Sequence, residues 1–436
     1  MANDEWKSSA GSLRLSSAIR HSDFVISLVV MTASAIIFVV DRLGAGFLGP
    51  YGNTWVETQS CNRLASEGLL CEFALSDSLS LDSVYRSYWT GRHPMDSRPA
   101  ENTLPDAAAK QGVETILLTD EPQVAGHPLA AGFFEKILLT ETGSIEAAKE
   151  IEETQIARLT QAAMEVIARQ REPFLLWIHS RGMSASWDAP QEYRHAFRDE
   201  DDPQPGDFVA PPHIKMSGSF DADELLRYVH AYAGQVTVTD LCLGALLDAA
   251  AEHRLAKSTL FAFTSPRGYP LGEHGQVGPV EDSLYGEVLN VPLFIRLPQA
   301  AGALLRTQEL IQPADLQELL LSQIVPGSFS LLRNIVEGRD YPPREIACAA
   351  ASGERAIRTP AWFLRQVQGN STEEKEHRIS LFAKPDDRWE VNEISSRAGE
   401  VTEELLAALD AFHQAADAGM LADLPPQSEL LCDQWR

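Results

Sequence analysis

The chain has 436 residues, of which 44% are hydrophobic and 22% charged, so it can bury a large core in one α/β domain with an appendage, or in two or three smaller units. Its formal net charge of -26 argues against a nucleic-acid partner, because the phosphates would be repelled. The five cysteines contain no Cys-x-x-Cys pair and are odd in number, which disfavours a disulfide framework or a zinc site.

An apolar run at residues 24–40 allows three interpretations of the N-terminal region. The run could be a signal sequence, a short membrane anchor, or, in its second half, the first strand of a chain whose translation starts at Met31. Asp23 at the head of the run counts against a signal or an anchor, and so does the need for that strand. We therefore favour the start at Met31, with residues 1–32 as an N-terminal extension and a cytoplasmic protein. Export or membrane anchoring through residues 24–40 is the alternative.

The stretch from residue 34 to residue 52 organises the rest of the chain. It opens with a continuous apolar run rich in Ile, Val and Phe, which predicts a strand buried on both faces. Asp41 and a glycine-rich turn follow directly. Ligands of open α/β sheets bind beyond the carboxyl ends of the strands, so Asp41 is a candidate metal ligand or acid/base group. A helix-capping aspartate is the alternative.

Strands and helices alternate along the rest of the main domain. We predict strands at residues 113–119, 174–179, 259–264 and 291–296, and helices at 84–89, 103–111, 144–171 and 221–253. This order predicts an α/β fold in which helices sandwich a mostly parallel central sheet, over residues 33–343. Short strands at 356–367 and 379–382 and a helix at 401–415 predict a small C-terminal α+β subdomain at 344–415, followed by a tail at 416–436.

Several ordered motifs give the chain a family resemblance. They are VVDRLGAGFLGPYG at 39–52, WTGRHP at 89–94, WDAPQEYR at 187–194, FTSPRGYPLGEHG at 263–275 and YGEVLNVPLFIRLP at 285–298. With these motifs the chain resembles the sulfatases of the alkaline phosphatase superfamily from about residue 33 to about residue 412. The resemblance implies an alkaline-phosphatase-like fold, hydrolysis of sulfate, phosphate or phosphonate esters, and a divalent cation, usually calcium.

The same resemblance implies four metal-ligand positions, and three of them hold residues that cannot bind calcium. The family's paired aspartates fall on Asp41 and Arg42, and its later Asp followed by Asn or His falls on Pro266 and Arg267. Calcium takes six to eight oxygen ligands, so Asp41 alone is too little. We expect no cofactor, and a divalent cation such as calcium only if the chain is active. We hypothesise that Arg42, Arg267 or both point at Asp41 as an ion-pair cluster; the alternative is that both turn to solvent.

The nucleophile of the family is also replaced. Its Cys-x-Pro-x-Arg pattern places the nucleophile position on Leu81, which has no lone pair to offer. A shift of one or two residues would bring Asp82 or Ser83 into place, with Arg86 as the supporting arginine. Of the residues around the GEHG segment, His274 survives, and we interpret it first as a structural histidine.

Two hypotheses about function follow from these replacements. The first is a catalytically inactive pseudoenzyme that acts by binding, with an anionic small molecule held in the old cleft by Arg42, Arg86 and Arg267. It is favoured because metal, nucleophile and substrate groups are lost together: the family's substrate histidine falls on Ser184. No nucleic acid or membrane partner is expected, and the oligomeric state is not readable.

The second hypothesis is an active hydrolase of sulfate, phosphate or phosphonate esters with altered machinery. Its catalytic residues would be Ser83 or Asp82, acting with Asp41 and His274. Because fold does not imply function, stoichiometric calcium and turnover would distinguish this enzyme from the pseudoenzyme.

Overall fold

The computed structural model describes residues 34–141, 143, 145–216, 218, 220–325, 327–368 and 378–433. The predicted extension at residues 1–32 lies outside these ranges. The second half of the apolar run forms strand β1 (Ala35–Val40), as predicted. Within the described ranges, no helix combines the length and the apolar character that a membrane crossing requires.

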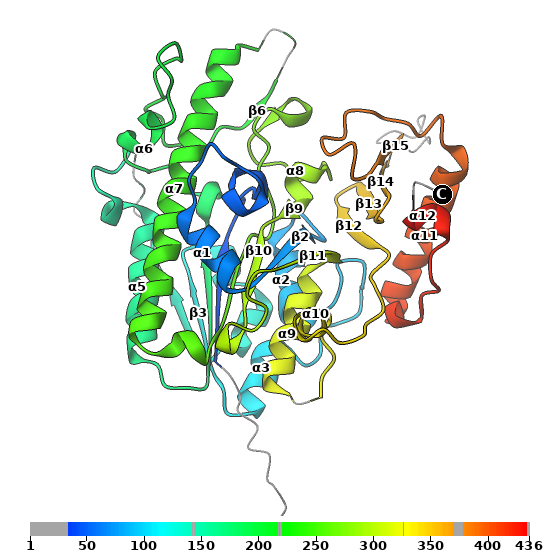
Figure 1. Ribbon diagram of the computed structural model, residues 1–436, viewed down its shortest axis with the longest axis horizontal. Helices are drawn as coiled ribbons and strands as arrows, with labels where there is room; N and C mark the ends of the chain where they lie inside the picture. Colours follow the sequence, from blue (N-terminus) through cyan, green and yellow to red (C-terminus); the bar gives the residue numbers. More distant parts are fainter. Residues whose placement is uncertain are drawn as a thin grey trace, which may run out of the picture. The chain divides into compact units, whose positions relative to one another are not determined.

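A nine-stranded sheet forms the centre of the main domain (Figure 1). In spatial order its strands are β11 (Leu305–Ile311), β2 (Leu69–Leu75), β10 (Leu293–Arg296), β7 (Leu260–Thr264), β1, β5 (Phe174–Ser180), β3 (Glu114–Thr119) and β4 (Glu135–Leu138), with β9 (Asn290–Val291) paired to β2. Strand β10 runs antiparallel to both of its neighbours, whereas β7, β1, β5, β3 and β4 are parallel. The predicted mostly parallel sheet is therefore confirmed.

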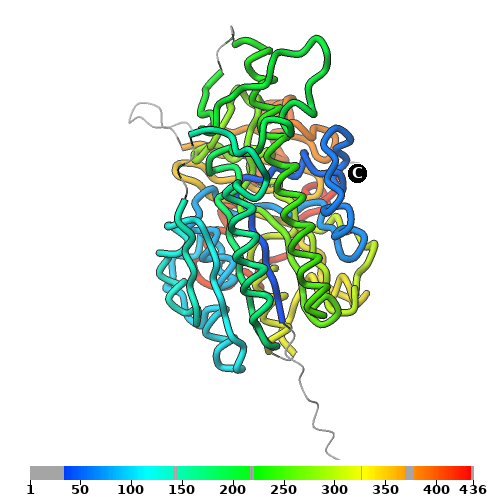
Figure 2. The backbone as a smooth tube through the Cα atoms, turned by 90° about the vertical axis from the view of Figure 1, so that its left-hand side faces the viewer, coloured from blue at the N-terminus to red at the C-terminus, as the bar shows by residue number. Residues whose placement is uncertain are grey.

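Helices cover both faces of this sheet. They are α1 (Gln59–Glu67), α2 (Leu81–Thr90), α3 (Leu104–Lys110), α4 (Pro122–Ala125), α5 (Gln155–Arg169), α6 (Gln191–His195), α7 (Ala222–Glu252), α8 (Gly286–Leu289), α9 (Pro313–Ile324) and α10 (Leu331–Glu337). Figure 2 shows α5 and α7 side by side across one face, with β1 behind them. Helices α2, α3 and α9 pack on the opposite face.

The apolar run of β1 is continuous because both of its faces are buried. Ile36, Phe38 and Val40 pack in the core beneath α5 and α7, while Ile37 and Val39 pack in the core beneath α2, α3 and α9. Parallel strands covered on both faces lose the alternation of apolar and polar residues for this reason. The register pairs Val40 with Ser180 of β5. The residues that follow β1, β5 and β7 thus lie close together at the carboxyl ends of these parallel strands.

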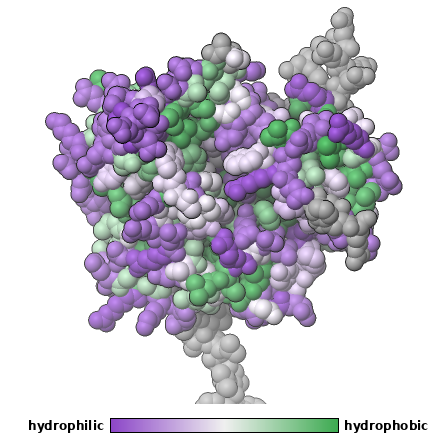
Figure 3. Space-filling view, turned by 45° about the horizontal axis from the view of Figure 1, so that its top comes forward, coloured by the Kyte–Doolittle hydropathy of each residue, from purple (hydrophilic) through white to green (hydrophobic). Residues whose placement is uncertain are grey.

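The C-terminal region forms the predicted small α+β unit. A four-stranded antiparallel sheet contains β12 (Ala347–Ala351), β13 (Glu354–Arg358), β14 (Trp362–Val367) and β15 (Arg378–Ala383). It is followed by α11 (Gly399–Ala418) and α12 (Glu429–Cys432). A separate two-stranded pair joins β6 (Ile214–Lys215) to β8 (Gln276–Val277). The face in Figure 3 is mostly hydrophilic, as the net charge of -26 leads one to expect.

Four predicted elements differ from the structure. The segment predicted as a strand at 356–367 is a hairpin of β13 and β14. The helix predicted at 144–171 begins only at Gln155, where the Thr154 side chain caps it by accepting a hydrogen bond from the Ala157 amide. Helix α2 begins at Leu81 rather than at residue 84. The strand predicted at 291–296 divides at Pro292 into β9 and β10, because proline has no N–H to donate to a sheet.

Candidate functional site

Asp41 follows β1 and is held at the edge of the sheet by backbone contacts. Its amide donates to the Ser180 carbonyl at 2.9 Å, and its own carbonyl accepts from the Met183 amide at 3.0 Å. Gly182 allows these two backbone segments to approach closely. Its φ is +49°, and a Cβ there would lie 2.6 Å from the Asp41 carbonyl oxygen. The side chain of Asp41 is therefore fixed in direction, and the residue is only 1% exposed.

Arg267 binds both carboxylate oxygens of Asp41. Its Nε donates to Oδ1 and its Nη2 to Oδ2, each at 2.9 Å, and its Nη1 donates to the Leu79 carbonyl at 2.5 Å. The hydroxyl of Ser184 donates to Oδ2 at 2.7 Å. Burial alone would raise the pKa of Asp41, but the charge and hydrogen bonds of Arg267, helped by the charge of Arg42, lower it to about 2. The hypothesis that an arginine points at Asp41 is confirmed for Arg267.

Arg42 is buried beside this pair but is bound differently. Its backbone has a φ of +59°, and its carbonyl accepts from the Tyr232 hydroxyl at 2.8 Å. Its Nη1 has no hydrogen-bond partner within the described part of the chain. Burial, and then repulsion by Arg267, lowers the pKa of Arg42 to about 10 despite the attraction of Asp41. Arg42 therefore adds charge near Asp41 without satisfying it.

The nucleophile position and its two neighbours lie in the first turn of α2. Leu81 is buried. The carboxylate of Asp82 lies 3.3 Å from Nε2 of His127, and the Ser83 carbonyl accepts a hydrogen bond from the Ser87 hydroxyl at 3.4 Å. Among the described residues, no hydrogen bond or ion pair joins Asp82 or Ser83 to Asp41.

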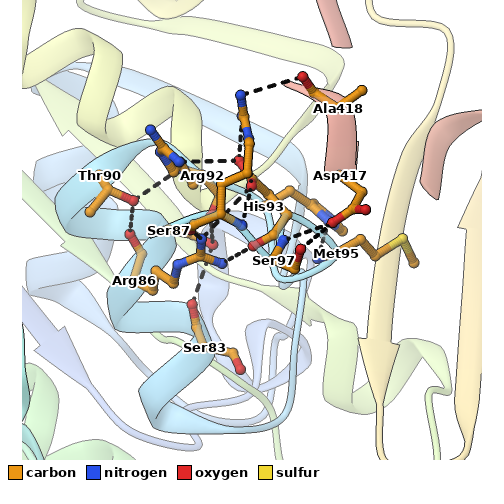
Figure 4. Close-up of polar contacts among 12 residues, drawn as sticks. Ser83, Arg86, Ser87, Thr90, Arg92, His93, Met95, Ser97, Asp417 and Ala418 are labelled. Carbon is orange, nitrogen blue, oxygen red and sulfur yellow. Dashed lines mark hydrogen bonds and ion pairs between the residues drawn. The ribbon is translucent and has the colours of Figure 1, made fainter. Parts of the chain in front are cut away.

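Arg86 lies one turn further along α2 and is turned toward the loop that follows the helix. Figure 4 shows its side chain among the polar groups of that loop. The guanidinium donates to the carbonyls of Asp96 and Arg98, and it lies 3.9 Å from an Asp96 carboxylate oxygen. Within the described residues, no hydrogen bond or ion pair joins Arg86 to Arg42, Arg267 or Asp41, so the contacts of Arg86 do not bring together the anion site predicted for the three arginines.

His274 lies in a different set of contacts. Its Nδ1 is 2.9 Å from a carboxylate oxygen of Glu287, its Nε2 is 3.3 Å from the Glu390 carbonyl, and its ring stacks on Tyr285 with 3.5 Å between centroids. Burial favours the neutral ring, but the hydrogen bond and charge of Glu287 raise the pKa of His274 above 6.5. These contacts fit the structural role that the sequence suggested.

His274, Glu287 and Glu390 also place three potential metal-ligand atoms within 4.8 Å of one another. Both carboxylate oxygens of Glu390 are already used, since they accept from Lys384 Nζ at 2.8 Å and from the Gly286 amide at 2.7 Å. A cation here would have to displace a lysine and break the His274–Glu287 hydrogen bond. The donor set fits internal ion pairs better than a metal.

Sequence reasoning missed the histidine at the end of β5. Nδ1 of His179 lies 2.6 Å from the Tyr85 hydroxyl, and its Nε2 has no partner within the described residues. Burial lowers the pKa of His179 to about 4, so the ring is neutral at pH 7. The available signal was a polar residue at the carboxyl end of the predicted strand FLLWIH. The family resemblance had placed Ser184 at a substrate position, but it did not predict the hydrogen bond of Ser184 to Asp41, which joins residues 143 positions apart.

Comparison with known proteins identifies the family of this chain. The family model described as sulfatase matches residues 34–324. Human iduronate 2-sulfatase is 22% identical over 345 residues, which cover 64% of this chain and 62% of that protein. The chain thus spans about 62% of the length of this relative.

Solved structures share the fold at low sequence identity. A phosphonate monoester hydrolase of Agrobacterium radiobacter has a TM-score of 0.70 and 17% identity, with 87% of this chain and 96% of that chain covered. A protein solved in complex with its substrate D-glucosamine-2-N,6-O-disulfate has a TM-score of 0.71 and 16% identity, with 88% and 98% covered. Since the family model matches well over half of the chain, this protein belongs to the sulfatase family and has the fold of the alkaline phosphatase superfamily.

Proposed function

We propose that this chain is a catalytically inactive sulfatase-family member that acts by binding. The observation that supports this proposal is the bidentate contact of Arg267 with Asp41, in which both carboxylate oxygens accept hydrogen bonds from one guanidinium at 2.9 Å. A bidentate arginine satisfies a buried carboxylate without a metal. In this proposal, Arg267 takes the place of the divalent cation that active relatives bind.

The residues around Asp41 fit a calcium ion poorly. A calcium site needs six to eight oxygens, whereas the other three ligand positions implied by the family resemblance hold Arg42, Pro266 and Arg267. Two buried guanidinium groups would repel a divalent cation, and the oxygens of Asp41 are already engaged. No catalytic step through a metal follows from this arrangement.

The nucleophile position supports the same proposal. Leu81 is buried and has no atom that can attack an ester. The alternative hydrolase would need Ser83 or Asp82 to act with Asp41 and His274. Asp82 is next to His127, and His274 is bound to Glu287 and Glu390, so these groups have other partners.

Of the three arginines first assigned to an anion site, Arg42 remains for that role. Arg267 is committed to Asp41 and Leu79, and Arg86 to the carbonyls of Asp96 and Arg98. Nη1 of Arg42 is an unpartnered donor within the described residues. Because Arg42 is only 1% exposed, we propose that a small anion in the old cleft would meet this group only when neighbouring side chains move aside.

Metal analysis and turnover assays test the proposal on the full chain. We expect less than about 0.1 equivalent of calcium per chain when the purified protein is analysed by mass spectrometry, because a specific calcium site would be close to fully occupied. We also expect no turnover of 4-nitrophenyl sulfate, phosphate or phenylphosphonate when calcium is added. One calcium per chain, with turnover lost in Ser83→Ala but kept in the neighbouring control Ser80→Ala, would establish the hydrolase instead.

A further inference from the structure

A cavity of about 450 Å³ lies between the loop after β1, the ends of β2 and β11, and the C-terminal sheet. Its lining includes Gly46, Phe73 and Phe363 but neither Asp41 nor Arg267. The volume falls in the range of about 300–1,000 Å³ that is typical of small-molecule sites. This cavity is therefore a candidate site separate from the Asp41 cluster.

Part of the cavity wall is apolar, and its residues come from both sheets. Phe73 and Leu75 of β2 face Phe363 of β14 and the cross-strand pair Ala349 and Ala356 of β12 and β13. The Arg358 guanidinium lies 5.7 Å from the ring centroid of Phe73, and the Lys384 ammonium lies 5.7 Å from that of Phe363. An aromatic ligand gains from edge-to-face or offset contact with such a wall, because aromatic rings favour these arrangements.

Most of the acidic groups in the lining already have a basic partner. Four carboxylates line the cavity, and three of them have a basic partner within 3 Å. These pairs are Glu72 with Arg306 at 2.9 Å, Glu287 with His274 at 2.9 Å, and Glu390 with Lys384 at 2.8 Å. The fourth is Glu273, whose Oε2 accepts a hydrogen bond from the Leu271 amide at 2.6 Å.

Two cations in the lining lack a carboxylate partner among the described residues. The guanidinium of Arg358 is nearly buried and donates to the backbone carbonyls of Pro360 and Trp362, which carry no net charge. Arg388 is exposed at the mouth of the cavity, and its guanidinium lies 5.2 Å from the ring centroid of Trp389. Trp389 itself is 58% exposed. Four carboxylates and four basic side chains line the cavity, so the positive charge that no direct ion pair offsets is local to Arg358 and Arg388.

We propose that this cavity binds a small aromatic anion, whose ring contacts the apolar part of the wall that includes Phe73 and Phe363 and whose acid group meets Arg388 and Arg358. Trp389 covers the ring at the mouth. The lining does not include Asp41 or Arg267, so this proposal goes beyond the proposed loss of catalysis. The two proposals are tested by different experiments.

Two fluorescent probes of nearly the same shape test the proposal. They are 8-anilinonaphthalene-1-sulfonate, which is an aromatic anion, and N-phenyl-1-naphthylamine, which lacks the sulfonate. We expect the anionic probe to bind the full chain saturably at one per chain, at least tenfold more tightly than the neutral probe. Equal affinities, or several equivalent anionic probes per chain, would overturn the proposal.

Matched variants locate the probe. A side chain at Gly46 would project into open space, since an added Cβ meets no atom within 4 Å, and the same holds for Gly399 at the start of α11. Gly46→Phe should weaken both probes at least tenfold, whereas Gly399→Phe should change neither. Unchanged binding to Gly46→Phe would refute the location.

The charge requirement is tested at the rim, where folding is least affected. Arg388→Gln should weaken the anionic probe about tenfold and leave the neutral probe unchanged. The proposal fails if both probes weaken equally, because Arg388 would then contribute only apolar contact, or if neither weakens. Far-UV circular dichroism and urea unfolding of each variant check that the fold is retained.

Discussion

Arg267→Met removes the one guanidinium that satisfies Asp41. The change deletes two charge-assisted hydrogen bonds of 2.9 Å from a carboxylate that is 1% exposed. Leaving one partner of a buried ion pair alone costs about 3–5 kcal/mol. The Ser184 hydroxyl and the charge of Arg42 remain near Asp41, so we expect the lower end, about 3 kcal/mol, in the free energy of unfolding measured with urea at pH 8.

The cost of Arg267→Met should depend on pH with a definite sign. In the parent, the pKa of Asp41 is about 2, below its ordinary value of 3.8. This depression contributes about 2–3 kcal/mol of stability, which is present above pH 3.8 and fades as the pH falls toward 2. In the variant, burial remains without the arginine, so the pKa of Asp41 rises above 3.8. The difference between parent and variant should therefore be larger at pH 8 than at pH 5.

Arg42→Met is the matched control for this experiment. It removes the same group from the adjacent buried position, but within the described residues Arg42 donates no hydrogen bond to Asp41. We expect a cost below about 1 kcal/mol, since the repulsion between two buried arginines is also relieved. Asp41→Asn combined with Arg267→Met should show a coupling energy above about 1 kcal/mol. Equal costs for the two arginine variants, or no coupling, would refute the assignment of the pair.

Three further predictions concern the metal position and the GEHG loop. A strong chelator should leave the thermal midpoint of the parent unchanged, and a marked drop would show that a metal supports the fold. Arg42→Asp combined with Arg267→Asn should give a chain whose thermal midpoint rises when calcium is added. At a calcium concentration of 100 times the dissociation constant, the gain in the free energy of unfolding should be about 2.7 kcal/mol. A folded variant whose midpoint does not respond to calcium would contradict this prediction. His274→Asn should lose stability mainly at low pH: the pKa of His274 is raised above 6.5, so the contribution of its contact with Glu287 is full below pH 6.5 and disappears as the pH rises through the folded-state pKa. A stability difference that grows above pH 7 in urea unfolding would contradict this role.

Much of the fold was readable because burial leaves a direct pattern in the sequence. The runs that form β1, β5 and β7 are continuous and apolar, since helices cover both faces of the sheet. Their order, with intervening helices, predicted the mostly parallel sheet. Boundaries were less readable where a single residue decides them, as Thr154 and Pro292 do.

The candidate site was readable only in part. The sequence identified Asp41, its position after a buried strand, and the arginines at two ligand positions implied by the family resemblance. It could not separate Arg42 from Arg267, although Arg42 is the immediate neighbour of Asp41. Nor did it predict that Arg86 would turn toward the carbonyls of Asp96 and Arg98.

The sequence by itself determined the family and the central sheet, and it showed Arg42, Pro266 and Arg267 at ligand positions that the family resemblance implies. Tertiary structure alone decided which arginine satisfies the carboxylate of Asp41. The pairing of β1 with β7 brings Arg267 to Asp41 across 226 positions. Arg42 has a positive φ, and within the described residues its guanidinium makes no hydrogen bond to Asp41. The physical reason is that a residue type fixes which bonds a side chain can make, whereas its direction and its partner depend on backbone geometry and on strand pairing.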